Sequence, residues 1–278
     1  MKSMADLNRR LIASLLVGTI VALLIIFSSH PVVSWVLLAV VASLAAMGTW
    51  EYAQLAVAKE IKPRARLMAV VAALEVVAFY IDVPQLSVLV LACAAVTFFL
   101  LHFNQTSNAL PNIAVQFFGV CYVAVPLSFL LWILYPQSGQ DGKWWLIYLI
   151  AVTKVTDVGA YFVGRLWGKR PLAPFLSPKK TIEGAVAGLI CAVGMSLLVR
   201  ALGVHFAQDA FALSWGAAVI LGVLISLFGQ LGDLAESLLK RDAVVKDSNS
   251  LPGFGGVLDM VDSLLLTTPV LYFFMRMQ

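Results

Sequence analysis

The sequence predicts an all-α polytopic membrane protein, with about nine transmembrane helices and a cytoplasmic N-terminus. Three observations support this fold class. Of the 278 residues, 61% are hydrophobic and only 12% are charged, whereas soluble domains have roughly 45–50% apolar and about 25% charged residues. Apolar runs of about 20 residues, the length that a helix needs to cross a bilayer, recur along the whole chain. The lysines and arginines gather between alternate runs.

Nine apolar runs define the predicted helices. The charged N-terminal segment lacks a small-x-small cleavage site ahead of a soluble body, so we expect the first run to be retained as a helix. A very short turn at Pro84 separates the third and fourth runs. The three cysteines lie inside apolar runs without a metal-like spacing, which indicates buried apolar residues and no disulfide. The predicted helices are 11–27, 33–50, 67–81, 85–103, 113–135, 144–164, 182–200, 212–231 and 258–275.

The distribution of basic residues predicts the orientation. With the N-terminus in the cytoplasm, fifteen of the nineteen lysines and arginines fall on the cytoplasmic side. Only Lys143, Arg200 and Arg276 fall outside, and Lys154 lies within a helix. We therefore expect a multi-pass protein of the cell (inner) membrane with its active site on the cytoplasmic side.

Polar residues are unevenly divided between the two halves of the chain. Residues 1–140 form N-terminal transmembrane helices with few polar anchors. Residues 141–278 form a transmembrane region with two cytoplasmic loops, 165–181 and 232–257, which hold most of the polar chemistry. This pattern predicts a catalytic region in the C-terminal half.

The first polar motif lies on the predicted helix 144–164. Lys154 and Asp157 are three residues apart, so they share a helix face. Charges inside a membrane segment are costly and usually face the bundle interior or a wet cavity. The pair either neutralises itself in helix packing or places Asp157 in the wall of a site. Three glycines that follow would permit a close helix approach.

The second motif, Ser177–Gly184, lies where a loop becomes a helix. Lys179, Lys180 and the hydroxyls of Ser177 and Thr181 would join the free N–H groups of the helix start in an anion site. A triphosphate fits such a site. The lysines could instead only fix the topology, but a topology anchor needs neither hydroxyls nor the neighbouring glutamate.

The third motif is the densest and runs from Gly232 to Asp262. Its first part places two acids, a serine and a lysine on one helical stripe, and its last part places two acids three residues apart at the start of the final helix. If these helices pack, the carboxylates converge, and Mg²⁺ prefers such oxygen ligands. The expected metal ligands are Asp233, Asp259 and Asp262, with Asp247 or Glu236 assisting.

These motifs resemble the phosphatidate cytidylyltransferases (CDP-diglyceride synthases). The family pattern closes with Ser-x-x-Lys-Arg, then Lys-Asp, then Pro-Gly-His-Gly-Gly and Asp-Arg-x-Asp. The segments 157–168 and Ser177–Gly184 are similar to the family's Asp-x-x-Ala-Tyr-x-x-Gly-Arg and Ser-Pro-Lys-Lys-Thr-x-Glu-Gly. The resemblance extends from about residue 150 to the end. The matching residues of the closing pattern are Ser237, Lys240, Arg241, Lys246, Asp247, Pro252, Gly253, Gly255, Gly256, Asp259 and Asp262.

The chain departs from the family pattern at two residues. Phe254 stands in place of the family's histidine, and Met260 in place of its arginine. The segment between Asp247 and Pro252 is one residue short. Every carboxylate of the pattern is kept, so we expect retained activity. A catalytically lapsed paralogue with a lipid-binding role, an ion-coupled membrane transporter and a transferase that uses another lipid acceptor stay open as alternatives.

The resemblance implies transfer of the cytidylyl group of CTP to phosphatidic acid, which gives CDP-diacylglycerol and pyrophosphate in phospholipid biosynthesis. It also implies dependence on Mg²⁺, with more than one divalent or monovalent cation, a homodimer, and no nucleic-acid partner. The residues expected to act in catalysis are Asp233, Lys246, Asp247, Asp259 and Asp262. Those expected to bind the substrates are Asp157, Ser177, Lys179, Lys180, Thr181, Ser237, Lys240 and Arg241.

Overall fold

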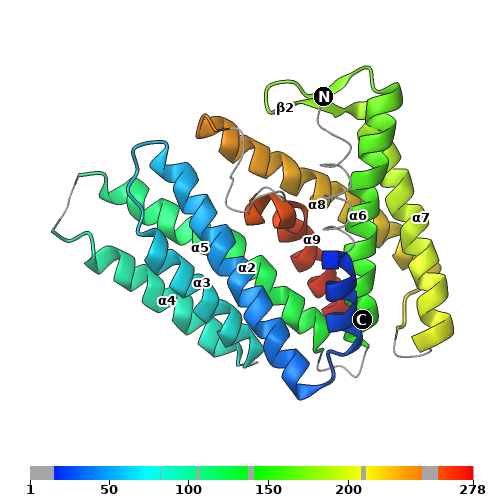
Figure 1. Ribbon diagram of the computed structural model, residues 1–278, viewed down its shortest axis with the longest axis horizontal. Helices are drawn as coiled ribbons and strands as arrows, with labels where there is room; N and C mark the ends of the chain where they lie inside the picture. Colours follow the sequence, from blue (N-terminus) through cyan, green and yellow to red (C-terminus); the bar gives the residue numbers. More distant parts are fainter. Residues whose placement is uncertain are drawn as a thin grey trace.

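The computed structural model describes residues 16–81, 83–104, 107–136, 141–207, 211–245 and 256–277. These residues are almost entirely helical (Figure 1). A helical segment Leu16–Ile26 comes first. The later helices are α2 (Pro31–Val57), α3 (Ala65–Tyr80), α4 (Pro84–Leu100), α5 (Ala109–Leu134), α6 (Gly142–Trp167), α7 (Ile182–Ala207), α8 (Trp215–Asp242) and α9 (Val257–Met277). They confirm a helical fold, and α3 and α4 are separate, as predicted.

Six of the described helices are long and apolar enough to cross a membrane: α2, α5, α6, α7, α8 and α9. Their outer faces expose large apolar side chains, such as Ile190, Leu198 and Ile220, which suit contact with lipid tails. The chain is therefore a membrane protein. The expected number of nine spans stays a prediction, because α3, α4 and the described part of the first helix are shorter than these six helices. The cytoplasmic N-terminus also stays a prediction.

Side chains that cap free backbone groups fix several of the helix starts. The Asp141 carboxylate accepts a hydrogen bond from Lys143 N (3.0 Å) at the start of α6. The Ser214 hydroxyl accepts one from Ala217 N (3.1 Å) at the start of α8. Such caps satisfy N–H groups that have no partner within the helix. Hydropathy does not detect them, which explains why observed and predicted boundaries differ by several residues.

The structure adds detail to one predicted loop and shortens the other. Loop 165–181 holds a short antiparallel hairpin of β1 (Pro171–Ala173) and β2 (Ser177–Thr181) within an otherwise helical fold. Loop 232–257 begins later than predicted, because α8 continues to Asp242. Its polar end stays helical because Lys240 pairs with Glu236 one turn earlier, at 2.9 Å, and with Asp259 on α9.

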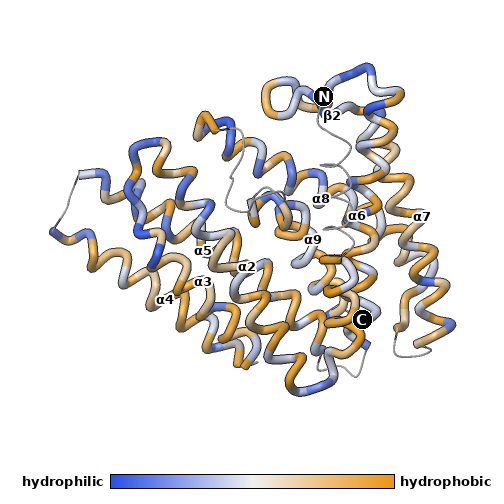
Figure 2. Tube along the Cα trace, in the orientation of Figure 1, coloured by the Kyte–Doolittle hydropathy of each residue, from blue (hydrophilic) through white to orange (hydrophobic). Residues whose placement is uncertain are grey.

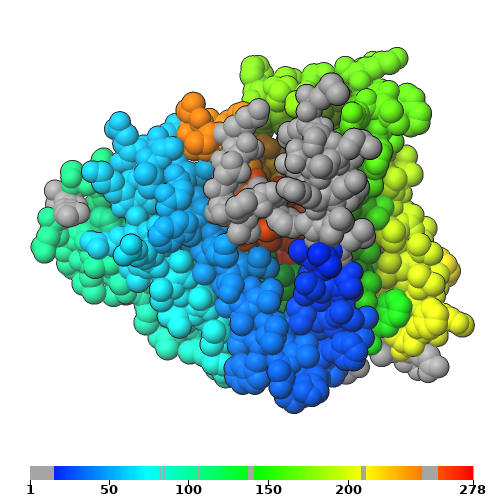
Figure 3. Space-filling model, viewed as in Figure 1, coloured from blue at the N-terminus to red at the C-terminus, as the bar shows by residue number. Residues whose placement is uncertain are grey.

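Two hydrophobic cores lie side by side and α9 belongs to both. One core is built mainly by α2, α3, α4 and α5, and it includes Leu258, Val261 and Leu265 of α9. The other is built mainly by α6, α7 and α8, and it includes Leu271 and Met275. Figure 3 shows α2, α3 and α4 (lighter blue and cyan) on one side and α6 and α7 (green and yellow) on the other. The start of α9 is therefore held against the N-terminal half.

Glycines bring the C-terminal helices into close contact. A Cβ atom at Gly184 of α7 would lie only 2.6 Å from the carbonyl oxygen of Ala160 in α6. A Cβ atom at Gly232 of α8 would collide with the carbonyl oxygen of Asp262 in α9. Close approach through small residues is typical of membrane helices. At Gly232 it also brings the acids of α8 next to those of α9.

The polar connections gather at one end of the molecule. Lys59, after α2, pairs with Asp242 at the end of α8 (2.9 Å). Arg241 Nε of α8 donates to the carbonyl oxygen of Leu176 in the hairpin (3.1 Å). Figures 1 and 2 show the α2–α3 connection, the hairpin and the C-terminal end of α8 at this end, with hydrophilic residues concentrated there. This arrangement agrees with the predicted grouping of the basic loops on one side of a membrane.

Candidate active site

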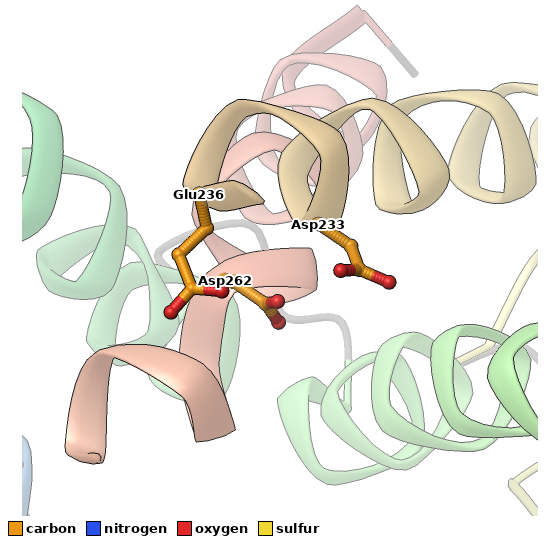
Figure 4. A group of neighbouring side chains, drawn as sticks. All are labelled: Asp233, Glu236 and Asp262. Carbon is orange, nitrogen blue, oxygen red and sulfur yellow. The ribbon is translucent and has the colours of Figure 1, made fainter. Parts of the chain in front are cut away.

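Three carboxylates meet where α8 crosses the start of α9. Asp233 and Glu236 extend from α8 and Asp262 from α9, and one oxygen of each lies within 4.8 Å of the others (Figure 4). Glu236 is 3% exposed and Asp262 is 8% exposed. We call these three residues the acidic cluster. The predicted convergence of the two carboxylate pairs on α8 and α9 therefore occurs.

Two lysines neutralise part of the cluster. Lys180 Nζ lies 2.5 Å from the Asp233 carboxylate. Lys240 Nζ lies 2.9 Å from Glu236 and also pairs with Asp259. Within the described part of the chain, no lysine or arginine lies at ion-pair distance from Asp262, whose Oδ1 accepts from the backbone N–H of Ser263 at 2.5 Å. A buried carboxylate without a cation is costly.

The donor set of the cluster fits a hard divalent cation. Mg²⁺ and Ca²⁺ bind carboxylate oxygens at about 2.0–2.6 Å, so three oxygens within 4.8 Å of one another can share one ion. Such an ion would also compensate Asp262. Asp259, a predicted metal ligand, is not one of the three, because its carboxylate pairs with Lys240 and contacts Glu236. It adjoins the cluster, and Glu236 takes the place expected for it.

A cavity of about 640 Å³ adjoins the cluster between α6, the hairpin, α7 and α8. Its wall combines acids, cations and small residues, and Asp233 belongs to both the cavity and the cluster. A ligand in the cavity that reaches Asp233 would therefore also reach the other two acids. The lining residues are Asp157, Ala160, Tyr161, Gly164, Arg165, Leu172, Lys179, Lys180, Thr181, Gly184, Ala185, Gln230 and Asp233.

The start of α7 is shaped by its own side chains. The Thr181 hydroxyl accepts from Gly184 N (3.1 Å), so it caps the helix. The Glu183 carboxylate accepts from the backbone N–H groups of Lys169 (3.1 Å) and Arg170 (3.2 Å), which ties the α6–β1 connection to α7. Part of the expected anion site, including the Thr181 oxygen, is thus engaged within the protein, whereas Lys179 and Lys180 are among the residues that line the cavity.

The structure brings together five of the predicted site residues around the cavity: Asp157, Lys179, Lys180, Thr181 and Asp233. Ser177 lies in β2 and Ser237 in α8, and neither lines the cavity. Arg241 holds the hairpin through the Leu176 carbonyl oxygen, a contact with protein rather than an open site. Lys246, Asp247 and Phe254 lie outside the described residues.

The sequence reasoning missed three polar residues of the cavity wall. Arg165 follows one turn after Tyr161, and its guanidinium donates to the Tyr161 hydroxyl (2.8 Å). Gln230 donates to the Ala185 carbonyl oxygen (3.2 Å) and so joins α8 to α7. Tyr161 and Arg165 belong to the motif 157–168 but were given no site role, although a spacing of one helical turn is a signal of a side-chain contact.

Known proteins match this chain along its whole length. A model of the cytidylyltransferase family matches residues 8–278. A phosphatidate cytidylyltransferase of Chlamydia pneumoniae is 33% identical over 289 residues, which cover 97% of this chain and 92% of that protein. One of Bacillus subtilis is 35% identical, over 71% of this chain and 72% of that protein. One of Chlamydia muridarum is 44% identical over 160 residues, and this match spans only 52% of that protein. The chain therefore belongs to the cytidylyltransferase family.

Proposed function

We propose that this protein transfers the cytidylyl group of CTP to phosphatidic acid and so makes CDP-diacylglycerol and pyrophosphate. The family and the names of its relatives support this reaction. The structural observation that carries the proposal is the position of Asp233, which links a cavity bordered by lysines to a buried acidic cluster. The family match favours a transferase over the ion-coupled transporter considered above.

The reaction needs positioning more than proton transfer. An oxygen of the phosphatidate phosphate attacks the α-phosphorus of CTP, the bond between the α- and β-phosphates breaks, and pyrophosphate leaves with the electron pair. A phosphate monoester is largely dianionic at neutral pH, with a second pKa of about 6, so no strong general base is required. The task of the protein is to hold two polyanions together in line.

The cations of the cavity wall suit the phosphates of CTP. Lys179, Lys180 and Arg165 border the cavity from the hairpin and from α6. Lys180 pairs with Asp233 at 2.5 Å, so its ammonium group lies beside the acidic cluster. A phosphate that reached Asp233 would meet Lys180 there, and we assign this lysine to the nucleotide.

The acidic cluster would hold Mg²⁺ through Asp233, Glu236 and Asp262, with Asp259 adjoining. The bound ion would neutralise the charge that develops on the reacting phosphates. The fit rests on three carboxylate oxygens within 4.8 Å and on the lack of an ion-pair partner for Asp262 among the described residues. Lys246 and Asp247, from the closing motif, stay proposed as catalytic residues, and Ser237, Ser177, Lys240 and Arg241 as residues that contribute to substrate binding.

The test is an assay with purified protein, radiolabelled CTP and phosphatidic acid in detergent. We expect labelled CDP-diacylglycerol, which disappears when EDTA is added and returns with Mg²⁺. Monodisperse protein that gives no lipid-linked label with ample Mg²⁺ would instead support the catalytically lapsed paralogue. A product with another lipid acceptor only would keep the transferase and change its substrate.

The proposal includes a position in the inner membrane with the active site toward the cytoplasm, and it rests on the distribution of lysines and arginines. In a cysteine-free background, we expect a cysteine at Pro174 in the hairpin to react with an impermeant thiol reagent only from the cytoplasmic side. A cysteine at Ser138 should react only from outside. The reverse pattern would invert the orientation.

The expected homodimer is part of the same proposal and is supported by the resemblance alone. Light scattering combined with size-exclusion chromatography in detergent measures the mass of the protein without the detergent. We expect twice the mass of the 30.1 kDa chain, and the mass of a single chain would contradict the proposal.

A further inference from the structure

A buried acid of the N-terminal half contacts the helix that carries two of the site's carboxylates. Glu51 lies near the end of α2 and is 3% exposed. Its Oε1 accepts a hydrogen bond from Val257 N (2.9 Å), and its Oε2 accepts one from Leu258 N (2.8 Å). Both donors belong to the first turn of α9. A single side chain thus joins positions 206 and 207 residues apart in the sequence.

These two hydrogen bonds satisfy groups that would otherwise lack partners. The first N–H groups of a helix have no acceptor within the helix. Val257 is 1% exposed and Leu258 is fully buried, so water does not supply an acceptor there. A carboxylate at a helix start is also stabilised by the helix dipole. Glu51 is therefore a cap provided by another helix, and both of its oxygens are used.

The geometry of this cap determines where the acids of α9 lie. Two hydrogen bonds that consecutive N–H groups donate to one planar carboxylate restrict both the position of the helix start along its axis and its rotation. Asp259 follows directly after the capped residues, and Asp262 lies one turn further along the same rigid helix. Asp262 is the one member of the acidic cluster that α9 provides, whereas Asp233 and Glu236 both come from α8.

We infer that Glu51 is a positioning residue, which holds α9 so that Asp262 meets Asp233 and Glu236 in a geometry that binds the metal. This inference rests on the proposed function for the identity of the cation. Outer residues that orient metal ligands commonly change metal affinity or activity by about 10–100-fold when they are replaced. The first half of the chain then contributes to the site by holding α9, through the Glu51 hydrogen bonds in addition to apolar packing.

The decisive variant is Glu51→Gln, which keeps the shape of the side chain. An amide has one acceptor oxygen, and its NH₂ group would face a backbone N–H, so one of the two hydrogen bonds is lost. The matched control is Glu75→Gln. Glu75 is a fully buried glutamate of α3 that accepts from the Ser87 hydroxyl on α4.

The measurements separate positioning from a general loss of stability. Binding of Mn²⁺, as a probe for Mg²⁺, is followed by electron paramagnetic resonance on monodisperse protein without substrates. The rate of CDP-diacylglycerol formation is measured in parallel. We expect Glu51→Gln to weaken Mn²⁺ binding and to lower kcat by about tenfold each, with KM for CTP unchanged and partial rescue by excess Mg²⁺. Glu75→Gln should change neither quantity.

Each other outcome has a defined meaning. Unchanged Mn²⁺ affinity in Glu51→Gln, or an equal loss in Glu75→Gln, would overturn the positioning role. If Glu51→Gln aggregates, Glu51→Asp decides. It keeps the charge but is too short for both hydrogen bonds, so we expect an intermediate loss of Mn²⁺ affinity, and wild-type affinity would contradict the inference. A wild-type protein that binds Mn²⁺ but forms no product would refute the proposed function and leave the test of Glu51 intact.

Discussion

The N-terminal and C-terminal helices bury acidic side chains in different ways. In α2–α5 the buried acids Glu75 and Glu51 accept hydrogen bonds from protein groups: Glu75 accepts from the Ser87 hydroxyl through one of its oxygens, and Glu51 accepts from two backbone N–H groups of α9 through both. In α8 and α9 the carboxylates of Asp233, Glu236 and Asp262 face one another (Figure 4). Because like charges at close range repel, the second arrangement requires cations or bound protons, and the described lysines supply only part of the positive charge.

The same contrast holds for other polar side chains. In the N-terminal half, the amide oxygens of Asn112 and Gln116 on α5 accept from the backbone N–H groups of Lys62 (3.1 Å) and Arg64 (3.2 Å) and so hold the α2–α3 connection. In the C-terminal half, Asp157, Lys179 and Lys180 border an open cavity. The comparison teaches that these polar groups of the first half bond within the fold, whereas several polar residues of the second half line a cavity.

The largest effect is expected from removing one charge of the acidic cluster. Asp262→Asn should lower the rate by about 100-fold or more, because it removes a proposed metal ligand that has no lysine at ion-pair distance among the described residues. Glu75→Gln removes a buried acid outside the acidic cluster, and the folded variant should keep nearly the full rate. Both rates are measured at saturating CTP over a series of Mg²⁺ concentrations. Equal losses of rate in the two variants would contradict the proposed difference between the two halves of the chain.

A smaller effect is expected for Asp259→Asn. Its carboxylate pairs with Lys240 beside the cluster rather than within it. We therefore expect a loss between that of Asp262→Asn and wild type, accompanied by a weaker requirement for the positive charge at Lys240. The check is a double-mutant cycle with Lys240→Met. The loss of rate in the double variant should be smaller than the combined losses of the two single variants. A loss as large as that of Asp262→Asn, additive with Lys240→Met, would place Asp259 among the metal ligands.

A third effect concerns the nucleotide. Lys180→Ala should raise the KM for CTP by roughly 10- to 100-fold, since a hydrogen bond to a charged group contributes about 1.5–3 kcal/mol. The KM for phosphatidic acid should change less. Lys62→Ala is the control, because Lys62 is an exposed lysine in the connection after α2. A selective rise in the KM for phosphatidic acid would assign Lys180 to the lipid instead.

The helices, the acidic stripes and five residues of the cavity wall could be predicted from the sequence for a physical reason. A helical period of 3.6 residues places acids three or four apart on one face, so the stripe of Asp233 and Glu236 and the pair Asp259 and Asp262 could be recognised before the fold was known. Spacing does not determine which face turns toward which neighbour. It could not decide that Asp259 turns to Lys240 while Glu236 joins the cluster.

Helical spacing could not predict contacts between residues that are far apart in the sequence. Glu51 follows a tryptophan near the end of an apolar run, and its partners in α9 lie more than 200 residues away. The hairpin formed by β1 and β2 is too short for a strand period to be visible, and its position depends on Arg241 and on Glu183. Both features arise from tertiary packing, which overrides local pattern.

The smallest effect is expected at the two departures from the family pattern, and it tests whether the site has adapted to them. Phe254 lies outside the described residues, so Met260→Arg carries the argument. Met260 is half-buried and packs against the N-terminal core, next to Asp259. An arginine there can direct its long side chain out of the core, and it leaves the carboxylates of Asp233, Glu236 and Asp262 in place. We therefore expect the rate of CDP-diacylglycerol formation to change by less than about tenfold, because the energetic effect of one exposed charge is small.

Met260→Leu, which keeps the apolar packing, is the control and should match wild type. A 100-fold gain with arginine would show that the native site is impaired, and a 100-fold loss would show that the thioether packing against the N-terminal core helps to hold α9 in place.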